Sequence, residues 1–184
     1  MVILIAPHEI QNFEAVYFND DELTIAGTNV TSPARYSNKV YIELIGKGTS
    51  SNIPTHLVSN TSWTSSHVLT DQAYIYLRLE FDAEAFPQGI PNVTAEMSGR
   101  KVLDTRSDTT IYSNNPAMII RDYLTDSVYG LGATADEIDD TTFEAAANDC
   151  DDTIVLSGGG SEKRYTCNGI VDTANTPRAN LENL

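Results

Sequence analysis

The sequence has few of the residues that build disulfide frameworks, metal sites and cationic surfaces. It contains two cysteines and three histidines, and 11 Lys and Arg stand against 26 Asp and Glu, for a net charge of −15. Two cysteines do not make a disulfide framework. Without basic patches the surface suits neither a nucleic acid nor an anionic membrane. We therefore expect no nucleic-acid partner. The acidity favours solubility and a basic partner, although simple solvation is its commoner explanation.

Long apolar runs are also missing. No stretch approaches the ~18 apolar residues of a membrane span, so we expect no stable membrane insertion. The apolar opening MVILIA has no basic region and no cleavage site, and it is more typical of a first strand than of a signal peptide. With 184 residues, of which 41% are hydrophobic and 20% charged, the chain has the composition of one large globular domain or two small ones.

Catalytic motifs are incomplete. His8 and Glu9 begin a zinc-protease helix motif, but Asn12 stands where the second histidine is needed. His56 and His67 have no nearby cysteine to complete a zinc site. No G-x-S-x-G elbow marks a nucleophile. We therefore predict that the protein is not an enzyme and has no catalytic, cofactor or metal site.

The segment 136–152 is strongly acidic and contains no Lys or Arg. Clustered carboxylates suit calcium. The EF-hand spacing fails, however, because Ile154 stands where a glycine is needed. Several of the acids lie at expected helix starts, where the helix dipole favours them. Cation binding by this segment is left open, with a solvated surface as the commoner explanation.

Alternation of apolar and polar residues predicts a series of short strands. It is clearest over 73–82, where the apolar side chains through Phe81 face one way and Tyr74 and Tyr76 face the other. Lys39–Ile45 alternates as well, with Val40, Ile42 and Leu44 on one side, and predicts a half-buried strand. The further expected strands are Val2–Ile5, Ala15–Phe18, Leu23–Ala26, Lys39–Ile45, Val93–Met97, Lys101–Leu103, Thr109–Tyr112, Thr153–Leu156 and Arg164–Ile170.

The segment 46–71 is rich in Ser, Thr and Asn and carries the single tryptophan, Trp63. We expect a long surface loop, and loops of this length are usually functional or mobile. Trp63 either anchors the loop on the body or contacts a neighbouring subunit, and anchoring is the commoner case. Trp63 with Tyr74 or Tyr76 would also make a stacking platform. These three are the candidate interaction residues.

Two amphipathic helices are predicted near 116–129 and 142–151. Asn115 suits the helix cap and Pro116 the first helical position, and Gly130 and Gly132 supply a C-terminal stop. The expected apolar face of the first helix is Ile120, Tyr123 or Leu124, Val128 and Leu131. The second helix is expected to begin with a capping box of Thr141 and Glu144, and Thr134 with Glu137 fits a similar box that starts at most one turn. Its expected face is Phe143, Ala146, Ala147 and Cys150.

These elements predict two segments. Residues 1–86 form a β-rich segment with the loop 46–71, and residues 87–184 form an α+β segment that contains both helices. A last helix, capped by Thr176, has only two turns, which indicates that the chain is truncated at its C-terminus and is a fragment of a longer protein.

Four sequence blocks resemble one protein family. They read G-x-P-N … G-R/K-x-V within Pro87–Ser107, Y-S-N-N-P-A … D-Y-L … Y-G-x-G ending at Gly132, F-x-x-A-A-N-x-C-D, and R-Y-T-C-N-G within Arg164–Thr173. Their order and spacing over about half the chain are similar to the N-terminal hub region of phage tail tip attachment proteins. These are the central tail hub proteins of the lambda-like host-specificity family. The first eighty residues match only loosely, and their domain identity is left open.

The resemblance implies an α+β fold: a β-rich hub-type domain with a short helical insertion of two or three amphipathic helices between strands. It implies a structural virion component of a phage or prophage tail tip hub, which joins the tail tube to the host-recognition fibre during assembly and attachment. The implied partners are other tail tip subunits, with a homotrimer of the full-length protein, and the distal tail and tape-measure proteins. The implied location is the virion tail tip, after assembly in the bacterial host cytoplasm.

Two alternatives stay open. One is a carbohydrate- or receptor-binding β module of the tail tip that uses the aromatic platform at Trp63. The other is a tail-associated cell-wall hydrolase, which needs a paired acid and base or a zinc triad. The sequence does not say which phage or host receptor is involved, or the oligomeric state of this fragment.

Overall fold

The computed structural model describes all residues from Met1 to Leu184. Its contacts divide the chain into two compact units, which we call unit 1 (Met1–Arg100) and unit 2 (Lys101–Leu184). The chain is β-rich with a few short helices, which agrees with the predicted α+β class. No helix combines the length and the apolar character that crossing a membrane requires.

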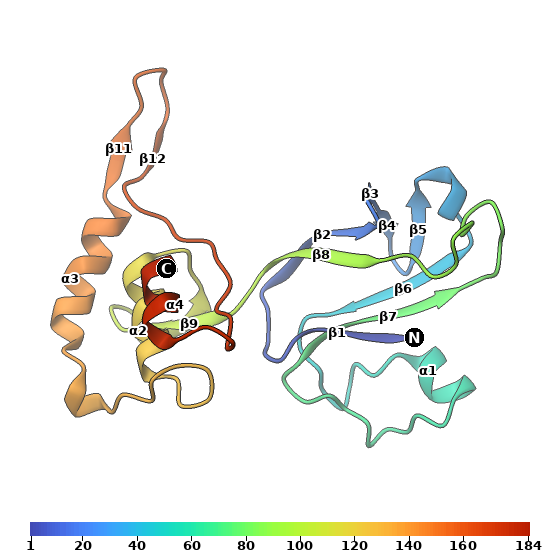
Figure 1. Cartoon of the computed structure of the whole chain (residues 1–184), viewed down its shortest axis with the longest axis horizontal. Helices are drawn as coiled ribbons and strands as arrows, with labels where there is room; N and C mark the ends of the chain where they lie inside the picture. The colour runs from blue at the N-terminus through green and yellow to red at the C-terminus, as the bar shows by residue number, and fades with distance from the viewer. The chain divides into compact units, whose positions relative to one another are not determined.

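Unit 1 contains two antiparallel sheets (Figure 1). One has the strand order β1-β7-β6-β5-β4 and the other β3-β2-β8. The elements are β1 (Val2–Ala6), β2 (Asn12–Phe18), β3 (Asp21–Glu22), β4 (Thr24–Ala26), β5 (Asn29–Ser32), η1 (Ala34–Tyr36), β6 (Val40–Ile45), α1 (Thr55–Asn60), β7 (Ala73–Leu79) and β8 (Val93–Ser98). Because β8 pairs with β2, unit 1 extends past the predicted boundary at 86 and 87. As domains, 1–86 and 87–184 stay a prediction.

Strand β7 is buried on both faces. Ile75 and Leu77 pack in one cluster with Phe18 of β2, so the main core lies between the two sheets. Tyr74 and Tyr76, on the opposite face, pack against a second cluster that includes Leu57 of α1. The strand predicted over 73–82 is present, and the segment after β6 covers its second face. Phe81, expected on the same face as Ile75 and Leu77, lies beyond the strand and is 93% exposed.

The segment 46–71 is attached to the body and contains α1, which was not predicted. Its two ends meet where Gly48 forms a bridge with Thr70. There the Gly48 N–H donates to the Gln72 carbonyl at 2.8 Å, and the Asp71 N–H donates to the Gly48 carbonyl at 3.0 Å. The segment is therefore a closed excursion that covers one face of a sheet.

Unit 2 contains two hairpins and three α-helices. Its elements are β9 (Lys101–Asp104), β10 (Thr109–Tyr112), α2 (Pro116–Thr125), η2 (Ala135–Glu137), α3 (Asp140–Asp151), β11 (Thr153–Val155), β12 (Ser161–Lys163) and α4 (Pro177–Asn183). β9 pairs with β10 and β11 with β12, and Figure 1 shows the β11–β12 hairpin extending from the end of α3. The core of this unit is formed by Val102, Ala117, Met118 and Ala147.

The start of α2 is as predicted and its end is not. The Asn115 side chain accepts a hydrogen bond from the Ala117 N–H, and Pro116 takes the first helical position. The helix ends at Thr125 and not near 129, because the Asp126 carboxylate accepts hydrogen bonds from the N–H groups of Val128 and Tyr129 and so begins a turn. The predicted face is corrected accordingly. Val128 and Leu131 are exposed, and the buried positions of α2 are Ala117, Met118 and Tyr123.

Two further expectations are corrected in unit 2. Asp139, and not Thr141, caps α3, and its carboxylate accepts from the Thr141 N–H at 3.1 Å and the Thr142 hydroxyl at 2.6 Å. The return strand is Ser161–Lys163 and not Arg164–Ile170, because pairing with β11 resumes directly after the glycine tip. The capping box of Thr134 and Glu137 is confirmed and starts one 3₁₀ turn.

Asn115 connects the two main helices of unit 2. Its side chain is fully buried, and its Nδ2 donates to the Ala147 carbonyl of α3 at 2.9 Å, while its Oδ1 caps α2. At the preceding residue, the Asn114 carbonyl accepts a hydrogen bond from the Cys167 N–H at 2.8 Å. The Asn115 side chain therefore caps the start of α2 and holds α3 against α2.

We expect Asn115→Ala to lower the free energy of unfolding of unit 2 by about 2–3 kcal/mol, because it removes the cap and leaves the Ala147 carbonyl without its partner. Denaturant titration followed by circular dichroism measures the change. Asn114→Ala is the matched control, since only the backbone of Asn114 makes the hydrogen bond described above. Equal stability of the two variants would contradict the role given to Asn115.

We expect Gly48→Ala to destabilise unit 1 by about 1–3 kcal/mol, the usual cost of overpacking. A Cβ at Gly48 would lie 2.0 Å from the Leu69 carbonyl oxygen and 2.7 Å from that of Val68. Gly46→Ala is the control, because its Cβ would meet its nearest atoms, in Ile10, at an ordinary 3.5 Å. Thermal unfolding of both variants tests the difference, and an unchanged midpoint for Gly48→Ala would show that the bridge tolerates a side chain.

Candidate interaction surfaces

Trp63 lies against the body of unit 1. Its ring is half-buried and packs on the cluster that contains Tyr74 and Tyr76. The indole Nε1 donates to the His67 carbonyl at 2.7 Å, and the two rings lie 5.2 Å apart. In this position Trp63 anchors the segment 46–71.

The other two predicted interaction residues are less accessible. Tyr74 is 1% exposed and Tyr76 5% exposed, and burial raises the pKa of the Tyr74 hydroxyl. A ring that is covered on both sides has no free face for a sugar, so of the three residues only Trp63 keeps accessible surface. A ligand-binding role for the three residues stays a prediction.

The histidines and cysteines are dispersed. His56 packs edge-on to Tyr41 at 4.7 Å, and the Nδ1 of His67 accepts the Thr64 N–H at 3.0 Å. Both cysteines are free, Cys150 half-buried and Cys167 buried. No group of three or more His, Cys, Asp or Glu side chains lies in an arrangement that could hold a metal ion.

Part of the acidic segment takes part in an ion-pair network centred on Arg106. The guanidinium binds Asp104 through two nitrogens, at 2.9 and 2.7 Å, and reaches Asp151 at 2.9 Å. Lys163 pairs with the other oxygen of Asp151 at 2.6 Å. These contacts join β9, the end of α3 and β12.

The network lowers the pKa values of its carboxylates. The hydrogen bond from Arg106 is the main cause that lowers the pKa of Asp104, and it outweighs burial, which acts the other way. Burial would raise the pKa of Asp151, but hydrogen bonds from Lys163 and Arg106 outweigh it, and the pKa falls. Both carboxylates are therefore anionic at neutral pH, and both form ion pairs with cationic side chains of the same unit.

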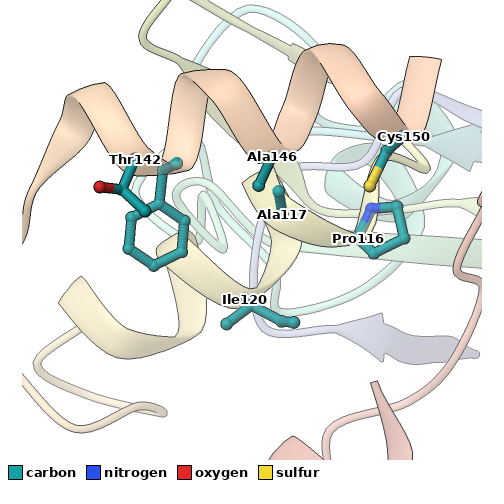
Figure 2. Close-up of a pocket in the computed structure, with 7 residues that line it drawn as sticks. Pro116, Ala117, Ile120, Thr142, Ala146 and Cys150 are labelled. Carbon is teal, nitrogen blue, oxygen red and sulfur yellow. The ribbon is translucent and has the colours of Figure 1, made fainter. Parts of the chain in front are cut away.

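An apolar groove of about 290 Å³ lies between α2 and α3 (Figure 2). Figure 2 shows side chains of α3 lying across from those of α2 along the groove. The sequence indicated most of the α3 face in advance, but it did not show that α2 would lie opposite, because helix pairing depends on contacts distant in the sequence. The lining residues are Pro116, Ala117, Ile120, Thr142, Phe143, Ala146 and Cys150.

Comparison with known proteins shows a similarity to a phage protein. The chain is similar to tip attachment protein J of Escherichia phage SECphi27, with 31% identity over 111 residues. The match covers 50% of this chain and 9% of that protein, so the chain spans less than a tenth of its relative's length. No protein-family model matches the sequence.

The Arg106 network predicts a pH-dependent contribution to stability. The folded pKa of Asp104 lies below the unfolded value of about 3.9, so the stabilisation is fully present above that pH and is lost as the pH falls through the folded pKa. Asp104→Asn should therefore lower the free energy of unfolding by about 1–3 kcal/mol at neutral pH.

The difference between wild type and Asp104→Asn should shrink as the pH falls below about 4. Denaturant titrations at a series of pH values measure it. Asp108→Asn, an exposed position in the same hairpin, is the control and should change little at any pH. A difference for Asp104→Asn that stays constant into acid would mean that the carboxylate charge is not the stabilising feature.

Proposed function

We propose that this chain is a structural component of a phage or prophage tail tip. The observation that carries the proposal is the 31% identity, over half of the chain, to a protein named as a tip attachment protein. The four sequence blocks that resemble tail tip attachment proteins support the same class. The role is mechanical and connective, not catalytic.

More specifically, we propose that the chain is part of the central hub, which joins the tail tube to the host-recognition fibre during assembly and attachment. Its partners in this proposal are other tail tip subunits, including copies of itself in a homotrimer of the full-length protein, and the distal tail and tape-measure proteins. The chain would be assembled in the bacterial host cytoplasm and reside at the virion tail tip.

Two features of the surface support a connective role. All residues of the β11–β12 hairpin are exposed, and Val155 within it is 80% exposed. Ile170 is 90% exposed. Exposed apolar side chains that lie together, as at Ile154, Val155 and Leu156, are typical of surfaces that other subunits cover. The groove of unit 2 is lined by apolar side chains, whereas the cell-wall hydrolase alternative needs a paired acid and base or a zinc triad in its cleft.

Immunogold electron microscopy tests the proposal. Antibodies raised against the purified chain should label the tail tip of intact particles from the phage or prophage that encodes it. The same antibodies pre-absorbed with the purified chain are the control. Label on capsids or along the tail tube, or virions that carry no label while the chain stays in the unassembled fraction, would contradict a tail tip location.

A further inference from the structure

The groove between α2 and α3 is apolar inside and acidic at its edge. Its volume of about 290 Å³ is near the lower end of ligand pockets, about 300–1,000 Å³, which is room for a few apolar side chains. Thr142, Ala146 and Cys150 lie along one stripe of α3, because residues three or four apart share a helix face. Two acids share this helix face. Asp139 lies three residues before Thr142, at one end of the stripe, and Asp149 lies three residues after Ala146, at the other end.

The negative charge at the groove is not neutralised by neighbouring cations. Hydrogen bonds, first of all from Thr142, lower the pKa of Asp139, which is therefore ionised at neutral pH. Arg121 is the cation on α2, and it is held by Asp140 through two contacts of 2.6 and 3.1 Å.

At the other end of the groove, the two cations beyond Cys150 are also engaged. Arg106 and Lys163 both pair with Asp151. Asp139 and Asp149, on the groove side of α3, have no ion pair to a Lys or Arg. The rim is therefore net negative.

We propose that the groove binds a segment of a partner protein that places apolar side chains between α2 and α3 and Lys or Arg side chains against the acidic rim. Burial of the apolar side chains supplies affinity, and the opposite charges supply orientation and selectivity. An amphipathic segment with a basic edge fits this surface as helices fit grooves in other complexes. The proposal adds a partner chemistry to the tail tip function proposed above.

Charge decides between this partner and a second copy of the chain. A copy carries a net charge of −15, so docking it on an acidic rim would bring like charges together. A basic segment gains from the same rim. The occupant is therefore a basic partner and not this chain itself.

Cys150 provides a reporter inside the groove. It lines the groove and is half-buried, whereas Cys167 is 8% exposed and burial raises the pKa of its thiol. Because the thiolate is the reactive form, a neutral thiol reagent should modify Cys150 first. A bound segment would cover Cys150 and slow the reaction.

The experiment uses the full chain and two synthetic helix-forming peptides of about four turns, with identical leucine positions and either lysines or glutamates elsewhere. At about ten times its Kd, the lysine peptide should slow modification of Cys150 by about tenfold, because only the free protein reacts. The effect should weaken with added salt, which screens the rim. The glutamate peptide should give no protection.

A pair of variants one residue apart locates the binding. Ala146→Arg places a long cationic side chain in the groove and should abolish protection, whereas Ala145→Arg lies on the exposed surface of α3 and should preserve it. Circular dichroism checks that both variants keep the helical content of the wild type. Both substitutions add one positive charge to an exposed alanine of α3, and only Ala146 lines the groove. The comparison therefore separates a groove effect from a general change of charge.

Three results of the peptide experiment would overturn the proposal: equal protection by the glutamate peptide, no protection by the lysine peptide, or protection that survives Ala146→Arg. A wild-type dimer in light scattering that Ala146→Arg dissociates would also overturn it, because a second copy would then be the occupant. None of these results changes where antibodies label a virion, so a failed groove test and a failed tail tip test are distinguishable.

Discussion

The architecture of unit 2 depends on the buried amide of Asn115. A buried side-chain amide is costly unless its groups are hydrogen-bonded. Here its oxygen accepts a hydrogen bond from the first free N–H of α2, and its nitrogen donates one to a carbonyl of α3. The two helices are thereby held side by side, and the groove between them follows from that arrangement. Removing the amide would loosen the helix start and the groove together.

In unit 1 the corresponding constraint is the double burial of β7. The three-stranded sheet covers one face of the strand, and the segment 46–71, which contains α1, covers the other face. The closure at Gly48 and Thr70 holds that segment in place. Aromatic residues that look available for ligands in the sequence, such as Tyr74 and Tyr76, are therefore used for packing.

The distribution of charge follows from how few cations the chain has. Arg106, Arg121, Lys163 and Arg164 each pair with an acid of the segment 136–152. These pairs stabilise the fold, but they leave no excess positive charge to offset the remaining acids. The surplus of acids appears at the surface, where it selects for basic partners and opposes self-association through acidic faces.

The sequence by itself determined the features that depend on neighbours within one turn. The cap at Asn115, the box of Thr134 and Glu137 and most of the strands follow from local hydrogen bonding and side-chain period. Only the tertiary structure decided where α2 ends and that β7 is covered twice. It also decided that the candidate residues Tyr74 and Tyr76 are enclosed, and that α2 and α3 form an apolar groove with an acidic rim. The reason is physical: a local pattern specifies which face of an element is apolar, but burial depends on which distant segment packs against that face.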